Sequence, residues 1–417
     1  MRPVDWPQNS TVRVVPSKAE YIAPRRNPAD THFRWHAEAR LFGPQGEPVG
    51  PDIGFQPLPK ADDARSLARV LQGHGHPFRI GGEGALEAGP DEFETLTGGS
   101  LGRARRVVRS QASWVESFAV NGGLFGIKPG VQIGVLGSLV HSLALYAALE
   151  GLHSGATVHL LDSVRPDKQA ARLAAHGVQI IYATPAQLRP VLAAGISLPD
   201  LRHVIVGGAK LDAGLCHSIA RLAPKACPHE FYGAAETSFI TLASGAAAGQ
   251  GSVGQPYPGV TLRIDDHTGL VWVQSPYLFR GYAGSDIGSA RWQDGWLTVG
   301  EVGQVSPDGL HLRGRAGRMV TVADRNVFPE EIEAFLLGQP GVEKVAVLPV
   351  LDGSRGNVLV AHLVGDEAQA ASLLTSLRRE LGPMLAPRRL FWRKDWPQLP
   401  SGKTDLAALA AAVTTWR

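Results

Sequence analysis

The fold of this chain is indicated by four short apolar runs: VQIGVL at 131–136, TVHLL at 157–161, VQIIY at 178–182 and HVIV at 203–206. The residues between the runs are numerous enough for helices, as in the stretch 168–176. Such alternation is typical of a parallel sheet with helices on its faces. Ligands bind these sheets at the carboxyl ends of the strands. We therefore expect the functional site in the Gly-containing loops that follow the runs.

The pattern changes further along the chain. Residues 250–313 are punctuated by Gly and Pro and rich in Trp, Val and Tyr, which predicts antiparallel strands in a small barrel-like subdomain. After Arg315 the expected elements are a helix from Pro329, strands at 345–348 and 358–361, a helix over 367–381 and a strand at 390–392. We therefore predict an α/β fold with parallel βαβ sheets in a large domain, 1–315, and a small α+β domain, 316–417. Residues 1–90 show weak periodicity, and we assign little function to them.

The composition excludes several classes of protein. Hydrophobic residues make up 44% of the 417 residues and charged residues 19%, which excludes disorder as the main state. The net charge of +3 is too small to indicate a nucleic-acid or membrane surface. Polar residues interrupt the most apolar stretch, 139–152, so no membrane span is expected. Two cysteines, Cys216 and Cys227, and no recognisable signal peptide lead us to expect a cytoplasmic protein.

A glycine-rich stretch, TGGSLGRARR at 97–106, is a candidate phosphate loop. Glycines let backbone amides turn toward a polyphosphate, hydroxyls donate to its oxygens and arginines add charge. The candidate ligands are Thr97, Gly99, Ser100, Gly102 and Arg105. Because Gly/Ser turns followed by Arg are common, this stretch alone leaves a plain turn open.

Three further stretches are candidates for binding or catalysis. The run at 203–206 is followed by Gly207, Gly208 and Ala209. Their small or missing side chains would let a flat ring lie against the backbone, although a tight turn would have the same kind of sequence. In FYGAAET at 231–237, Glu236 can ligate Mg²⁺ or be an ordinary solvated carboxylate. Lys403 lies on a Ser-Gly turn, from which its ammonium can neutralise charge developing on a phosphate.

Taken in order, these stretches resemble the motifs of the adenylate-forming superfamily, which includes AMP-dependent acyl-CoA synthetases, aryl-CoA ligases, peptide-synthetase adenylation domains and luciferases. The resemblance runs from about residue 95 to 410. Further matching stretches, also in family order, are 251–260, 294–301, Gly314-Arg315, 326–333 and 400–403. Each stretch is ambiguous by itself, but the ordered series is a strong signal.

The resemblance implies an ATP-dependent acid-thiol ligase. A carboxylic acid, aryl or fatty, is activated as its acyl-AMP with release of pyrophosphate. The acyl group then passes to the pantetheine thiol of CoA or of an acyl carrier protein. Mg²⁺ on Glu236 and the loop 97–105 would hold the pyrophosphate, and Lys403, on a mobile C-terminal lid domain, would bridge the carboxylate and the α-phosphate.

The resemblance also assigns the nucleotide and acyl sides. Besides the phosphate loop, the nucleotide residues are Gly207, Gly208, Ala209, Tyr232, Gly233, Glu301 and Arg315. Glu301 and Arg315 would hold the ribose hydroxyls. The acyl side would include His141, Gly207 and Phe239, although a satisfied core histidine is nearly as good an interpretation of His141.

Several positions depart from the family pattern. In the phosphate loop the unusual residues are Gly98, Leu101, Ala104, Arg105 and Arg106. Ala235 stands where Thr is usual, Glu301 where Asp is usual, and Gly317 at the hinge where Asp or Lys is usual. The region before the phosphate loop is also shorter than in typical members.

Two consequences of these departures remain open. Asp324 replaces a Gly in the loop expected to line the pantetheine path, so we expect slow transfer to free CoA and keep a carrier protein as an alternative acceptor. The altered phosphate loop keeps a non-catalytic nucleotide-binding protein open. An oxidoreductase is disfavoured because no Gly-x-Gly-x-x-Gly opens a helix in the first βα unit.

Overall fold

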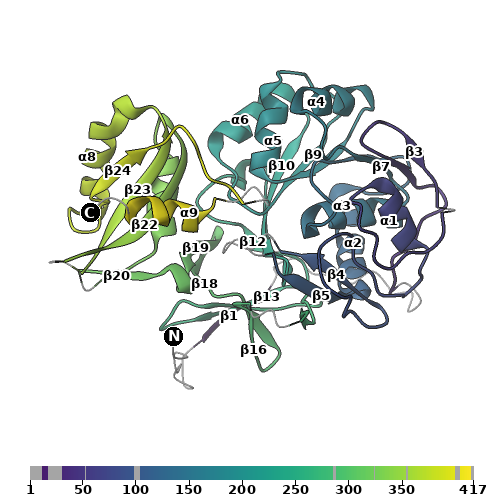
Figure 1. The fold of residues 1–417 in the computed structure, drawn as a ribbon, viewed down its shortest axis with the longest axis horizontal. Coiled ribbons are helices and arrows are strands. Elements are labelled where there is room, and N and C mark those ends of the chain that lie inside the picture. The colour runs from purple at the N-terminus through teal and green to yellow at the C-terminus, as the bar shows by residue number, and fades with distance from the viewer. Residues whose placement is uncertain are drawn as a thin grey trace.

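The computed structural model describes residues 12–16, 31–51, 53–97, 104–284, 288–323, 325–353, 356–399 and 404–414. Its centre is a nine-stranded sheet of order β12-β11-β10-β9-β8-β6-β7-β2-β3 (Figure 1). The strands are β2 (Arg40–Phe42), β3 (Pro48–Val49), β6 (Gln132–Val135), β7 (Thr157–Leu160), β8 (Ile180–Ala183), β9 (His203–Val206), β10 (Cys227–Ala234), β11 (Ser238–Ser244) and β12 (Gln255–Pro256). From β10 to β2 all neighbours are parallel, which confirms the predicted parallel sheet.

Helices cover both faces of this sheet (Figure 1). The helices are α2 (Gln111–Phe125) and α3 (Ser142–His153) on one face, and α4 (Pro166–Ala175), α5 (Pro185–Ala193) and α6 (Ala213–Leu222) on the other. In β8, Ile180 and Tyr182 belong to the core with α2 and α3, whereas Ile181 and Ala183 belong to the core with α4 to α6. Successive strand residues point to opposite faces, and burial of both faces explains why the runs are almost continuously apolar.

The N-terminal residues contribute more structure than the sequence indicated. Strand β2 extends the parallel sheet through its pairing with β7, and β1 (Val12–Pro16) pairs with β13. The Asp63 side chain caps helix α1 (Ala64–Leu71) by accepting a hydrogen bond from the Ser66 amide at 2.7 Å. The position of a strand in a sheet and the strand with which it pairs depend on residues far away in the sequence. Local periodicity therefore did not indicate them.

Three smaller antiparallel units lie around the main sheet. A five-stranded sheet of order β1-β13-β14-β17-β16 contains β13 (Thr261–Asp265), β14 (Val271–Gln274), β16 (Arg291–Gln293) and β17 (Trp296–Thr298). A three-stranded sheet joins β15 (Gly281–Tyr282), β5 (Arg106–Ser110) and β4 (Glu92–Leu96). A hairpin is formed by β18 (Glu301–Ser306) and β19 (Gly309–Arg315). The last two units contain the residues on either side of the candidate phosphate loop and the pair Glu301 and Arg315.

The C-terminal residues build a separate layered unit (Figure 1). Its sheet contains β22 (Val342–Asp352), β23 (Gly356–Gly365) and β24 (Arg389–Trp392), and a short hairpin joins β20 (Val320–Val322) and β21 (Arg325–Val327). Helices α7 (Pro329–Leu337) and α8 (Ala370–Leu381) share a core with Val347, while α9 (Leu406–Thr414) shares a core with Ala346 and Leu348. Helix α9 was not among the predicted elements. The domain boundary at 315/316 stays a prediction.

Among the described residues, no helix is long and apolar enough to cross a membrane.

Candidate active site

The ends of the candidate phosphate loop are held together at its base. The Thr97 amide donates to the Arg105 carbonyl at 2.9 Å, and the Arg105 amide donates to the Thr97 hydroxyl at 3.3 Å. Residues 98–103 between these ends, including Gly99, Ser100 and Gly102, lie outside the described part of the chain. The base of the loop adjoins His141, because Leu96 pairs with this residue in an isolated bridge.

His141 lies at the carboxyl end of the sheet, where it is the N-cap residue of α3. Its amide donates to the Ser138 carbonyl at 3.1 Å. The same loop is anchored by Asp62, which accepts hydrogen bonds from the Ser138 hydroxyl and, at 2.9 Å, from the Leu139 amide. Burial raises the pKa of the Asp62 carboxyl, and the two hydrogen bonds act in the opposite direction. The loop therefore has a fixed shape next to the phosphate loop.

The glycine stretch after β9 contains a buried glycine, Gly207, followed by an exposed one, Gly208. Gly208 has φ +81°, a left-handed conformation that side chains other than glycine rarely adopt. A Cβ at Gly207 would lie 2.1 Å from a ring carbon of Phe231, so the ring packs directly against the glycine backbone. Gly208 and Ala209 are exposed, which leaves this backbone accessible at the carboxyl end of the sheet.

The Tyr-Gly stretch contains a bulge between β10 and β11. A Cβ at Gly233 would lie 1.8 Å from the Ser238 carbonyl oxygen, so only glycine fits here. The Tyr232 hydroxyl is buried and has no hydrogen-bond partner in the described structure. The pKa of this phenol lies well above its usual value, first because of burial and then because of the nearby charge of Glu301, while Arg315 acts in the opposite direction. The bulge thus brings Tyr232 close to both predicted ribose residues.

Glu301 and Arg315 face each other across the β18–β19 hairpin. The Arg315 Nε donates to the Glu301 Oε1 at 2.9 Å. Burial opposes the charge of Arg315, but the charge and hydrogen bond of Glu301 outweigh it and the pKa of Arg315 is raised. The pair offers a carboxylate acceptor and a guanidinium donor side by side.

Glu236 is buried and firmly held. The Tyr282 hydroxyl donates to its Oε1 at 2.7 Å, and the Phe279 amide donates to its backbone carbonyl at 2.8 Å. Burial and the charge of Glu236 raise the pKa of Tyr282, whereas the charge of Arg105 acts in the opposite direction. Arg105, Tyr282 and Glu236 thus lie near one another, although 131 positions separate Arg105 from Glu236 in the sequence.

A single carboxylate is consistent with magnesium at this position. No group of three or more His, Cys, Asp or Glu side chains that could hold a metal ion occurs in the described ranges. Mg²⁺ in nucleotide sites is commonly bound by one or two carboxylates together with substrate phosphates and waters. Glu236 therefore fits a magnesium ion that arrives with its nucleotide, and does not fit a resident metal cluster.

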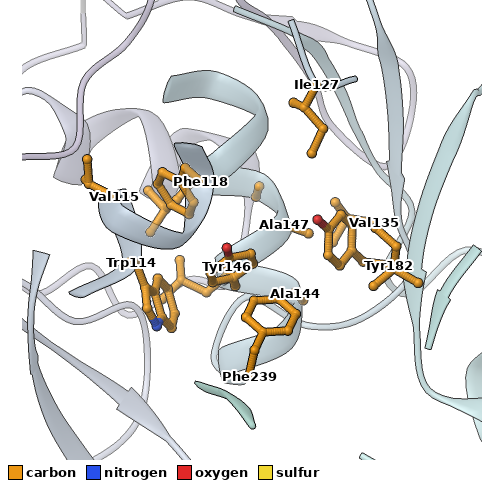
Figure 2. Packing of buried hydrophobic residues seen from close by; sticks show 14 of the residues in the cluster. Trp114, Val115, Phe118, Ile127, Val135, Ala144, Tyr146, Ala147, Tyr182 and Phe239 are labelled. Carbon is orange, nitrogen blue, oxygen red and sulfur yellow. The ribbon is translucent and has the colours of Figure 1, made fainter. Parts of the chain in front are cut away.

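Phe239 is part of the hydrophobic core and is 3% exposed. Its ring centroid lies 4.7 Å from those of Phe231 and Tyr257 and 5.2 Å from that of Tyr146. Figure 2 shows Phe239 beside Tyr146 and below α3, on the same face of the main sheet as Tyr182. Its predicted contact with the acyl group stays a prediction.

Lys403 lies outside the described part of the chain. Among the described residues nearby, Gln398 pairs with Thr404, and the Trp396 indole donates to the Thr404 hydroxyl at 3.1 Å. Asp324 also lies outside the described residues. The structure thus leaves the roles of both residues as predictions.

Two residues of the site were not predicted. Tyr282 binds the Glu236 carboxylate, and Arg109 is fully buried and donates to the Ala235 carbonyl at 2.5 Å. Burial lowers the pKa of Arg109 to about 9, and the charge of Glu236 acts in the opposite direction. A charged residue inside the apolar strand RVVRS was the available sequence signal, but its partner is 126 positions away.

This arrangement belongs to a recognised class of enzyme. The family model of AMP-binding enzymes matches residues 93–283, and that of the AMP-binding enzyme C-terminal domain matches residues 331–403. The uncharacterized acyl-CoA ligase YhfT of Bacillus subtilis is 31% identical over 341 residues, covering 79% of this chain and 67% of that protein. The 3-hydroxybenzoate-CoA ligase of Aromatoleum is 27% identical, over 76% of this chain and 65% of that protein. The chain thus spans about two thirds of the length of these relatives.

Solved structures agree with this fold. The amide bond synthetase McbA of Marinactinospora thermotolerans superimposes with a TM-score of 0.66 at 24% identity, over 77% of this chain and 69% of that one. O-succinylbenzoate CoA synthetase MenE of Bacillus subtilis, solved with ATP and magnesium, has a TM-score of 0.67 at 23% identity, over 76% and 69%. The chain belongs to the AMP-binding enzymes of the adenylate-forming superfamily. It is an AMP-forming ligase of the acid-thiol type, as the ordered motifs predicted.

Proposed function

We propose that this enzyme activates a carboxylic acid as its acyl-AMP and passes the acyl group to the thiol of CoA. The main support is that three motifs far apart in the sequence come together. The charges of Glu236, Glu301 and Arg315 all act on the buried hydroxyl of Tyr232. The relatives named as CoA ligases support the thiol acceptor. An acyl carrier protein is the alternative acceptor.

In the first step a carboxylate oxygen attacks the α-phosphorus of ATP, and the bond to the bridging oxygen of pyrophosphate breaks. The protein must position the two reactants and stabilise negative charge on the phosphates. We assign Thr97 and Arg105 to the departing pyrophosphate, and Lys403 to the oxygens around the α-phosphorus. Glu236 would hold Mg²⁺, which when bound neutralises phosphate charge.

The nucleotide itself is bound by the other residues of the site. The Glu301 carboxylate accepts hydrogen bonds from the ribose hydroxyls, and Arg315 donates beside it. The adenine would lie against the exposed backbone at Gly208, with Tyr232 on its other side. The buried Tyr232 hydroxyl, which has no partner in the described structure, is available to the nucleotide.

In the second step the thiol sulfur attacks the acyl carbon, and AMP leaves with the electrons of the broken carbon–oxygen bond. We propose that residues 316–417 act as a lid that brings Lys403 to the site for adenylation and then turns about Gly317 to admit the pantetheine arm. The substrate is an aryl or a fatty acid; relatives include proteins named for either class. His141 and Phe239 would lie on the acyl side. We place the reaction in the cytoplasm.

Acid-dependent exchange of labelled pyrophosphate into ATP, measured over a panel of aryl and fatty acids, tests this proposal. Wild-type enzyme is expected to exchange with a subset of the panel, and the Glu236→Gln and Lys403→Ala variants are expected to lose this activity. Lys394→Ala, an exposed lysine of the same C-terminal unit, is the matched control and should exchange normally. Tight ATP binding without exchange for any acid would instead favour a non-catalytic nucleotide-binding protein.

A further inference from the structure

The turn that contains Glu236 is held by an unusual buried cation. Arg109, on β5, is 0% exposed. Its guanidinium donates to the Ala235 carbonyl, to the Tyr277 carbonyl and, at 3.4 Å, to the Ser113 hydroxyl. All three acceptors are uncharged oxygens. Burying a charge is costly unless it is well paired, so an arginine here requires an explanation.

The same turn is conformationally demanding. Ser238, directly after it, has φ +55°, a conformation that non-glycine residues seldom adopt. The Trp114 indole donates to the Ser238 hydroxyl at 3.1 Å, and the ring of Trp114 also lies 5.7 Å from the Arg109 guanidinium. Strained turns persist only where the surroundings hold them. Arg109 and Trp114 thus hold the two ends of the turn at Ala235 and Ser238.

A second set of contacts fixes the Glu236 side chain from the segment 277–282. Phe279 binds the Glu236 carbonyl and Tyr282 binds its carboxylate. Arg109 joins this segment to the turn, because one guanidinium donates to Ala235 and to Tyr277. The guanidinium has several donors in a rigid plane, and a smaller cation cannot reach both carbonyls in the same way.

Strand β5 also begins at the end of the candidate phosphate loop. Arg105 closes the base of the loop through Thr97, and Arg109 lies four residues further along the same segment. One short strand therefore connects the part of the site that would hold the pyrophosphate to the part that would hold magnesium.

We propose that Arg109 is a positioning residue that holds the Glu236 carboxylate in register with the base of the phosphate loop at Thr97 and Arg105, so that magnesium and the triphosphate are bound together. This inference rests on the proposed role of Glu236. It predicts that loss of Arg109 weakens nucleotide binding in the presence of Mg²⁺ more than it weakens nucleotide binding in the absence of Mg²⁺.

Calorimetric binding of a non-hydrolysable ATP analogue, with Mg²⁺ and with EDTA, tests the proposal without turnover. The measured quantity is the ratio of the Kd in EDTA to the Kd in Mg²⁺. In Arg109→Met this ratio should fall by about tenfold, equivalent to one charge-assisted contact of about 1.4 kcal/mol, while the Kd in EDTA changes by less than about twofold. Arg109→Lys, which keeps the charge but loses the paired donors, should be intermediate. Ser113→Ala, which touches the guanidinium but not the turn, should match the wild type.

Two further variants keep the outcome decisive. Trp114→Phe keeps an aromatic ring in the core but removes the hydrogen bond to Ser238 and reduces the ring contact with Arg109. A smaller fall in the same ratio is expected even if Arg109→Met does not fold. An unchanged ratio in Arg109→Lys and Trp114→Phe, or in a folded Arg109→Met, would overturn the inference. Glu236→Gln separates this failure from that of the proposed function. If Glu236→Gln also leaves the ratio of the two Kd values unchanged, the magnesium role of Glu236 is wrong. If the ratio falls in Glu236→Gln but not in the other variants, only the role of Arg109 is rejected.

Discussion

Glu150 provides the sharpest test of the packing described above. This carboxyl, on α3, is 0% exposed. It accepts hydrogen bonds from the Asn121 amide at 2.9 Å, from the Tyr146 hydroxyl at 3.3 Å and from the Tyr182 hydroxyl. Burial raises the pKa of this carboxyl, and the three hydrogen bonds lower it by less, so that the pKa is about 8 instead of 4.5. The group is therefore neutral in the folded protein at pH 7 but ionised in the unfolded chain.

The shift has a definite sign and size. Between pH 4.5 and about 8 the folded state binds one proton more than the unfolded state, so stability falls as pH rises. Its contribution is fully present below pH 4.5, declines by about 1.4 kcal/mol per pH unit and levels off above about pH 8. Over the whole interval this amounts to about 5 kcal/mol. The amide of Glu150→Gln cannot ionise, so the stability of this variant does not fall with pH for this reason.

Urea unfolding of the wild type and of Glu150→Gln, followed by tryptophan fluorescence, measures the difference. Between pH 6 and pH 7.5 the stability of the variant relative to the wild type should increase by about 2 kcal/mol. Any constant cost of the amide cancels in this comparison. Glu380→Gln, at an exposed carboxylate on α8, should show no such change. A relative stability that is constant with pH would mean that Glu150 is already ionised in the folded protein, and the account of a neutral buried network would be wrong.

Four further substitutions have defined outcomes. Gly233→Ala should destabilise the fold by about 1–3 kcal/mol in urea unfolding, because its Cβ would lie 1.8 Å from the Ser238 carbonyl; wild-type stability would contradict the bulge geometry. Glu301→Gln should raise the KM for ATP by about tenfold with little change in kcat, since a neutral amide binds ribose hydroxyls less well; the reverse pattern would remove Glu301 from the nucleotide site. Lys403→Ala should lower pyrophosphate exchange by about 100-fold or more without changing the Tm, and exchange within a few-fold of the wild type would reject the lid. Asp324→Gly should speed single-turnover transfer from acyl-AMP to CoA, and an unchanged rate would reject the acidic-loop argument.

The sequence determined the order and type of most elements. Alternation of short apolar runs with helical stretches predicted β6, β7, β8 and β9, and the observed strands end within two residues of the predicted limits. This succeeded because a strand buried on both faces is apolar at almost every position, a property visible in a few neighbouring residues. The ordered motifs likewise indicated the family, because glycines at Gly208 and Gly233 meet backbone requirements that no other residue meets equally well.

Only the tertiary structure decided which distant residues share a site. The structure decided the pairing of β2 with β7 and the covering of the C-terminal sheet by α9. It also decided the contacts of Arg109 and Tyr282 with the Glu236 turn, which lies 126 positions from Arg109. Glu150, likewise, is a plain helix residue in the sequence, and its neutrality follows from its complete burial in the folded protein. Periodicity and propensity are local properties, whereas burial, charge compensation and hydrogen-bond partners depend on which surfaces the folded chain brings together. The sequence thus determined what the elements are and which motifs they contain, and the packing decided how those motifs form one site.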